Sequence, residues 1–220
     1  MKHVLLFTLL LGAVALQAQD SENDKRTIPK GTWNIGGDFS FGFHDQESTN
    51  EASTSNLDRY LFSFSPRIGY VFADNWMLGL KAGYGFSKSD NERIENGEFT
   101  GETENKGESI SVAPYIRRYF GVGKNLLFNL QGELGYSASW SENISGSSER
   151  ATSTSDRFNV SIRPGITFFV SNKLALESSL GVLEYYATKS DQSNGFDNTS
   201  SGVNLSLDPS SLFFGLSYYF

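Results

Sequence analysis

Apolar and polar residues alternate along most of the chain after about its first thirty positions. Near the end, for example, Leu212, Phe214, Leu216, Tyr218 and Phe220 occupy every second position. Side chains at every second position share one face of a β-strand. The pattern therefore predicts a protein built of strands, each with one aromatic or aliphatic face and one polar face.

Short turns and long polar stretches divide the alternating segments into eight predicted strands. The turns are at 73–75, 121–125 and 171–172, and the long polar loops are at 44–58, 89–108, 141–156 and 187–202. Each strand exceeds the roughly 9 to 11 residues that a tilted strand needs to cross a bilayer. The predicted strands are Thr32 to Phe43, Arg59 to Phe72, Trp76 to Lys88, Ser109 to Phe120, Leu126 to Trp140, Arg157 to Val170, Leu174 to Tyr186 and Val203 to Phe220.

A Ser-x-x-Pro segment recurs in four of these strands, with its proline at 66, 114, 164 and 209. The spacing of about 45 to 50 residues matches two barrel strands with one short turn and one long loop. Because a barrel has no free edge, we expect the prolines at β-bulges, where a missing N–H is tolerated. The apolar parity also changes within the last strand, which predicts an extra residue near Ser210 and Ser211.

Alternation alone does not distinguish a membrane barrel from a soluble barrel that holds a ligand inside. The volume of the aromatic face decides between them, because an eight-stranded barrel is barely wide enough inside for its side chains. The aromatic face, with residues such as Phe41, Tyr60, Phe64 and Trp76, is too large to fit there. We therefore predict an all-β, eight-stranded, antiparallel up-and-down transmembrane β-barrel whose apolar face contacts lipid.

The opposite face of the predicted strands carries charges of both signs among glycines and serines. Charged side chains in a narrow lumen need partners because water is scarce there. We interpret them as a salt-bridge network that closes the barrel, and the alternative is a hydrated path that conducts ions. The predicted lumen charge network consists of Asp38, Arg67, Lys81, Arg117, Glu133, Arg163 and Glu177.

The first residues predict a secretory signal peptide. Lys2 and His3 precede the apolar run Val4 to Leu16, which is too short for a membrane span and ends in small and polar residues. We expect residues 1–18 to be the signal peptide, 19–31 to be a short polar periplasmic leader, and 32–220 to be the barrel. No apolar run of 18 residues follows, so any span must be made by strands.

Composition and charge exclude several other classes of protein. The chain has no Cys, so a disulfide framework, a catalytic thiolate and an anchor through a lipidated Cys are excluded. Its formal net charge of −7 makes it a poor candidate for binding nucleic acid.

Residues that could carry out catalysis are scarce. Once the signal peptide is removed, His44 is the only histidine, and it lies beside Asp45 in a polar loop. We expect a solvated loop residue there, and we predict no enzymatic activity, no metal site and no cofactor. A lipid-modifying enzyme would need His44 within hydrogen-bond reach of a Ser and an acid. The acidic loops could bind divalent cations, although they lack the ligand spacing of a calcium loop.

The last strand resembles the closing strand of bacterial outer-membrane barrels. The signature of that family is a Gly, an aromatic residue three positions later and a terminal aromatic residue, which Gly215, Tyr218 and Phe220 match as a C-terminal assembly signal. With the signal peptide and the repeat, 32–220 resembles the small barrels of the OmpX and OmpA transmembrane-domain type. The resemblance implies an integral protein of the Gram-negative outer membrane that contacts its lipids and lipopolysaccharide and is inserted by the barrel assembly machinery.

Loop lengths predict the orientation of such a barrel. Short turns face the periplasm and long loops face outside in this family, so both termini should be periplasmic. We expect a non-enzymatic protein with a closed, salt-bridged lumen that acts structurally or through its surface loops in adhesion or interaction. The alternative is a conduit of the OmpW type, a family associated with small apolar solutes that leave through the wall. Wall glycines and prolines are compatible with that alternative, whereas the lumen charges argue against apolar cargo.

Overall fold

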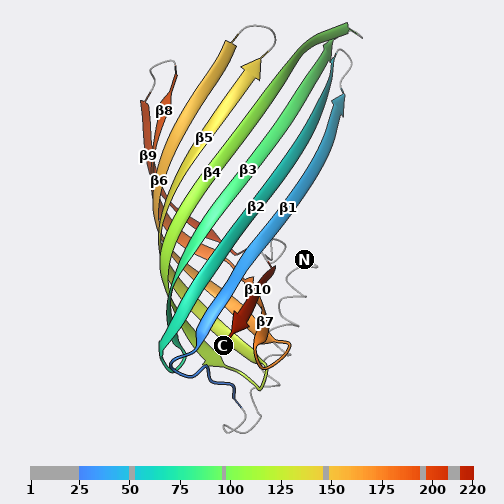
Figure 1. Ribbon diagram of the computed structural model, residues 1–220. Coiled ribbons are helices and arrows are strands. Elements are labelled where there is room, and N and C mark those ends of the chain that lie inside the picture. The colour runs from blue at the N-terminus through green and yellow to red at the C-terminus, as the bar shows by residue number, and fades with distance from the viewer. Residues whose placement is uncertain (1–24, 50–52, 96–97, 146–148, 194–196, 208–213) are drawn as a thin grey trace.

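The computed structural model describes residues 25–49, 53–95, 98–145, 149–193, 197–207 and 214–220, and these residues form one antiparallel β-sheet (Figure 1). No helix in these ranges is long and apolar enough to cross a membrane. The strands are β1 (Trp33–Thr49), β2 (Ser53–Ala73), β3 (Trp76–Glu95), β4 (Glu98–Gly121), β5 (Leu126–Ser145), β6 (Glu149–Phe169), β7 (Leu174–Ser179), β8 (Val182–Gln192), β9 (Asp197–Ser206) and β10 (Phe214–Tyr219).

The sheet closes into a barrel at the end where short turns join the strands, which we call the turn end. There β1 to β6 pair in sequence order, β6 pairs with β7, β7 pairs with β10, and β10 pairs with β1. Toward the opposite end, which we call the hairpin end, β8 pairs with β6, and β9 pairs with β8. The predicted antiparallel barrel is therefore confirmed, and the last two of its eight predicted strands are each divided in two.

Pro164 accounts for the division between β7 and β8. The N–H of Leu180 donates to the carbonyl of Pro164 at 2.9 Å, and the register against β6 advances by one residue at Gly181. This is a β-bulge opposite a proline, as expected. A side chain at Gly181 would collide with the carbonyl oxygen of Ser206, so only glycine fits there.

Pro66 and Pro114 are accommodated without a bulge, so the prediction of bulges at these two positions is wrong. The β2–β3 ladder skips Ser65 and Pro66, and the β4–β5 ladder skips Ala113 and Pro114, with the same register on both sides of each gap. The missing proline N–H therefore interrupts pairing on one side of the strand only. Pro209 lies outside the described residues.

The parity of the outward residues changes between β9 and β10, as the sequence indicated. Odd-numbered residues of β9 and even-numbered residues of β10 are the exposed apolar ones. The predicted extra residue near Ser210 and Ser211 lies outside the described residues.

The four predicted long loops are largely strand, so that part of the prediction is wrong. Pairing continues to Thr49 with Thr54 in the β1–β2 hairpin, and comparably far in the β3–β4, β5–β6 and β8–β9 hairpins. Cross-strand polar contacts support these ladders. Hydrogen bonds from Lys106 and Lys88, for example, lower the pKa of the Glu104 carboxyl. We call residues 44–58, 89–108, 141–156 and 187–202 the hairpin extensions.

The outward face of the barrel is apolar, as predicted for contact with lipid. Phe39 and Leu78, for example, expose 60% and 57% of their surface. Aromatic side chains gather toward both borders of this face, where amphipathic rings suit the boundary between hydrocarbon and head groups. They include Trp33, Tyr70 and Trp76 toward the turn end, and Tyr60, Tyr84, Tyr136 and Trp140 toward the hairpin end.

Candidate functional site

Inside the barrel, Glu177 of β7 lies between two buried arginines. Its Oε2 accepts hydrogen bonds from Arg67 Nη2 of β2 at 2.9 Å and from Arg117 Nη1 of β4 at 2.6 Å. Arg67 also donates through Nη1 to Asp38 Oδ2 of β1 at 3.0 Å. Arg67, Arg117 and Glu177 are each at most 6% exposed, so these charges are stabilised mainly by one another.

A second ion cluster surrounds Glu133 of β5. Lys81 Nζ lies 3.0 Å from both carboxylate oxygens, and Arg163 Nε donates to Oε2 at 3.2 Å. Gln131 joins the clusters, because its amide donates to Glu133 and its Oε1 accepts from Arg117 Nε at 2.5 Å. The structure thus brings together all seven predicted residues and adds Gln131, which has the same parity as Glu133. We call these eight residues the charge layer.

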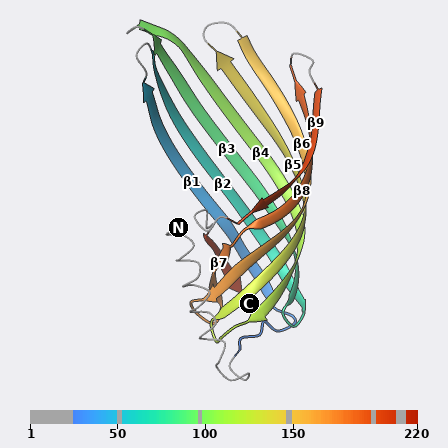
Figure 2. The ribbon, with the colours of Figure 1, turned by 180° about the vertical axis from the view of Figure 1, so that it is seen from behind.

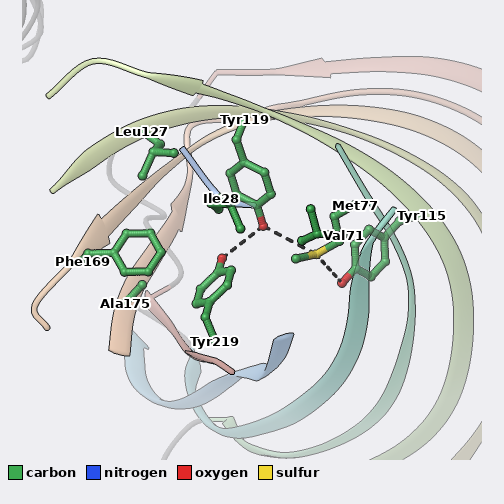
Figure 3. Packing of buried hydrophobic residues seen from close by; sticks show 9 residues of the cluster. All are labelled: Ile28, Val71, Met77, Tyr115, Tyr119, Leu127, Phe169, Ala175 and Tyr219. Carbon is green, nitrogen blue, oxygen red and sulfur yellow. Dashed lines mark hydrogen bonds between the residues drawn. The ribbon is translucent and has the colours of Figure 1, made fainter. Parts of the chain in front are cut away.

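An apolar layer lies in the lumen toward the turn end. Figure 3 shows how its side chains pack. Tyr119 and Tyr219 meet at its centre, with their hydroxyl oxygens 3.1 Å apart. Tyr219 also donates to Glu177 Oε1 at 2.8 Å and so ties the two layers together. This layer was not predicted from the sequence, although its signal is present where both faces of a strand become apolar. The layer comprises Ile28, Val71, Met77, Tyr115, Tyr119, Leu127, Phe169, Ala175 and Tyr219.

Residues 25–31, which we call the strap, lie across the turn end of the barrel. Ile28 is only 3% exposed and lies within the apolar layer (Figure 3). Its N–H donates to Asn75 Oδ1 at 2.8 Å, and its carbonyl accepts from the Asn75 N–H at 2.9 Å. The guanidinium of Arg26 stacks over the ring of Phe169 at 3.6 Å. The expected polar leader therefore contains a hydrogen-bonded segment with one buried side chain, Ile28, which its polar composition concealed.

A hollow of about 260 Å³ remains in the lumen, and all eight residues of the charge layer line it. Serines of β2 and β7 line it together with charged side chains of the layer. Ser63, Ser65, Ser178 and Ser179 are among its lining residues, and Gly165 lines it on β6. We call this space the lumen hollow.

The wall is not closed by pairing along its whole length within the described residues. β1 pairs with β10 from Asn34 to Asp38, but its residues 39–49 are not paired with β9. The two strands lie at opposite borders of the sheet toward the hairpin end (Figure 2). Outward apolar side chains here are strongly exposed, at 71% for Val203 and 67% for Phe41. We call these facing edges, 39–49 of β1 and 197–206 of β9, the seam.

The predicted C-terminal signal residues occupy distinct environments. Gly215 faces the lumen, where any side chain would collide with Asp38 Oδ1. Tyr218 and Phe220 face outward and stack with ring centroids 5.9 Å apart. The main chain of Phe220 exchanges two hydrogen bonds with Trp33, which joins the last residue to the first strand.

His44 lies on the exposed part of β1. Its Nε2 is 3.5 Å from Gln46 Oε1, and the residue that faces it on β2 is Arg59. Within the described ranges, no three His, Cys, Asp or Glu side chains are grouped as a metal site would require. The geometry described around His44 therefore contains none of the Ser and acid contacts that the enzymatic alternative needs.

Comparisons with known proteins identify the fold. The model of a family described as outer membrane protein beta-barrel domain matches residues 6–220. A major outer membrane protein from Thermus thermophilus has a similar structure, with 12% identity, a TM-score of 0.50, and coverage of 86% of this chain and 99% of that one. Comparison with curated proteins gives no match.

Two further structures are less similar. OprG from Pseudomonas aeruginosa has 14% identity and a TM-score of 0.41, and the match covers 87% of this chain and 97% of that one. The outer membrane protease OmpT from Escherichia coli has 10% identity and a TM-score of 0.40, over 90% of this chain and 95% of that one.

Proposed function

Because this chain belongs to the family of outer membrane protein β-barrel domains, we propose that it is a non-enzymatic barrel of the bacterial outer membrane that does not conduct ions and acts through its hairpin extensions. In this proposal the turn end and both termini face the periplasm, and the hairpin extensions face the outside. The partners would be outer-membrane lipids and lipopolysaccharide beside the barrel, and an extracellular surface contacted by the extensions.

The observation that carries this proposal is the double seal of the lumen. The charge layer joins β1 to β7 with buried ion pairs, and the apolar layer closes the turn end behind it. An ion would have to displace paired charges and then cross the apolar layer. Within the part of the chain that the structure describes, the strap adds Ile28 to the second barrier.

The hairpin extensions support an interaction role because they are ordered and polar. Their strands remain paired as far as Ser145 with Glu149 and Asp191 with Asp197, well beyond the apolar band of the wall. A paired ladder holds side chains in fixed positions, so it loses less conformational entropy on binding than a flexible loop would. Such extensions suit recognition of another surface.

Planar-bilayer conductance of the refolded protein tests the seal. Folding should first be checked by the heat-dependent shift in gel mobility. We expect no single-channel steps at high protein loading in molar salt, since the two layers leave no continuous water path. Stable steps from folded protein would contradict the proposal and place the protein among conduits.

A conduit with a sideways exit is the second candidate, and the seam favours it. Edges that are not paired with each other, next to the lumen hollow, would let a small apolar solute pass from the outer lumen into the bilayer. Uptake of such a solute by proteoliposomes, faster than by empty liposomes while conductance stays silent, would favour this candidate. Equal uptake rates would contradict the conduit and leave the interaction role of the hairpin extensions.

A further inference from the structure

The two ends of the barrel differ in charge. The hairpin extensions contain sixteen Asp and Glu residues and four Lys and Arg residues. The strap and the turn segments 73–75, 121–125 and 171–173 contain five Lys and Arg residues and one Asp. The turn end is therefore a cationic surface on an acidic protein, and charge complementarity indicates an anionic partner there.

Arg118 extends this cationic surface onto the lipid-facing wall. It pairs with Trp76 in the β3–β4 ladder and has the outward parity of Ile116 and Phe120. Its guanidinium lies over the rings of Trp76 and Phe120, at 5.0 and 5.8 Å from their centroids. Its Nη1 also donates to the main-chain carbonyl of Asp74 at 3.1 Å. The charge is thus held at the aromatic border of the wall, which is the level of lipid head groups.

Lys173 provides a second cation of the same kind, three strands further round the barrel. It immediately precedes β7, and its Nζ lies 6.0 Å from the centroid of the Tyr218 ring. Tyr218 faces outward and stacks with Phe220 at the same border. In the described part of the chain, neither Arg118 nor Lys173 has a carboxylate contact, so both charges remain available to an external anion.

The aromatic border toward the hairpin end carries acids instead of cations. Tyr136 donates to Asp156 Oδ1 at 2.6 Å, and the hydroxyl of Tyr84 lies 3.5 Å from Glu108 Oε1. A phosphate would be repelled by these carboxylates, whereas it would be attracted to the cations at the turn end. The contrast assigns an anionic lipid to the leaflet beside the turn end.

We propose that the turn end binds anionic phospholipids of the leaflet beside it, with the head group at Arg118 or Lys173 and the acyl chains on the apolar wall. A lipid such as phosphatidylglycerol carries a net negative charge, whereas the phosphate of a zwitterionic lipid is compensated by its own ammonium group. The proposal deepens the lipid contact proposed above and rests on a barrel that lies in a membrane. It does not depend on whether the lumen conducts ions, so the conductance test and the lipid test can fail separately.

Native mass spectrometry of the refolded protein in detergent tests this preference, with phosphatidylglycerol and phosphatidylcholine of identical acyl chains as the probes. We expect phosphatidylglycerol to bind about fivefold more tightly, since a Lys or Arg at a membrane surface attracts anionic lipid by this order of magnitude. Equal affinities would overturn the proposal. Glycerol 3-phosphate, which lacks the acyl chains, should not displace the lipid at equal concentration. Displacement would reveal a site for free phosphate and would also overturn the proposal.

Three variants locate the binding. Arg118→Gln combined with Lys173→Gln removes both cations and should make the two lipids bind equally, whereas Arg118→Lys keeps the charge and should keep most of the preference. Lys106→Gln combined with Lys189→Gln makes the same change in net charge on the hairpin extensions and should keep the full preference. Heat-dependent gel mobility verifies that each variant is folded. The proposal is wrong if the folded turn-end variant retains the full preference, or if the hairpin-extension variant loses it equally.

Discussion

At the centre of the lumen, Glu177 Oε2 accepts from Arg67 and Arg117, and Oε1 accepts from Tyr219. These four side chains come from β2, β4, β7 and β10, so one carboxylate joins strands from around the barrel. Removing one member of a buried ion cluster leaves the charges of its partners buried without a counter-ion. The resulting loss of folding free energy exceeds what the intact cluster contributes to it. Individual residues of the charge layer should therefore be costly to replace.

The variant Glu177→Gln should lower the free energy of unfolding by about 3 to 5 kcal/mol, because it leaves two arginines buried with one fewer anion. Urea unfolding in detergent, followed by gel mobility, measures the change. Glu104→Gln is the matched control on a hairpin extension, where its carboxylate pairs with partly exposed lysines, and it should be close to wild type. Equal stability of the two variants would show that the charge layer is not a stabilising element.

Gly215→Ala should also destabilise the barrel, because the new Cβ would collide with Asp38 Oδ1 and displace the acceptor of Arg67. Overpacking of this kind costs about 1 to 3 kcal/mol. Gly132→Ala is the control, since its Cβ would meet Ile116 Cγ2 at an ordinary 3.6 Å. Thermal midpoints of the two variants provide the measurement, and equal midpoints would contradict the packing argument.

At the scale of elements, the strands that face lipid were predictable and the hairpin extensions were not. Alternation marks a strand only where one face is apolar, so the segment Phe62 to Phe72 has a clear signal. In residues 44–58 both faces are polar, so alternation gives no signal there. The strands continue because β1 and β2 keep the register that they have in the barrel. The strap was missed for a related reason, since a single buried Ile28 among charged residues has no periodicity.

The variant Ile28→Ala should loosen the strap from the apolar layer. We expect a loss of about 2 to 4 kcal/mol, since the side chain is almost fully buried. Trypsin should then cut faster after Lys25 and Arg26, which can be followed by mass spectrometry. Ile68→Ala changes the same side chain on the lipid face, where it is 45% exposed, and should not accelerate cleavage. Equal cleavage rates in both variants would show that Ile28 does not hold the strap.

At the scale of the whole molecule, two layers of different chemistry close one barrel. Of these, the sequence predicted the charge layer, because charged residues at lumen parity stand out against glycine and serine. The apolar layer was hidden, because inward residues such as Met77 and Tyr115 look like wall residues until the pairing register is known. The distinction matters for the proposal that the lumen does not conduct ions, because each layer would then be a separate barrier.

Conductance of combined variants tests whether the two layers act as separate seals. Arg117→Ala with Gln131→Ala should open the charge layer, and Ile28→Ala with Tyr119→Ala should open the apolar layer. Each pair alone should remain silent in planar bilayers, because the other layer still blocks ions. Only the fourfold variant should show single-channel steps, provided that heat-dependent mobility shows it to be folded. Single-channel steps from the folded variant with Ile28→Ala and Tyr119→Ala would contradict this expectation. They would mean that ions pass the charge layer and that the apolar layer at the turn end is the seal.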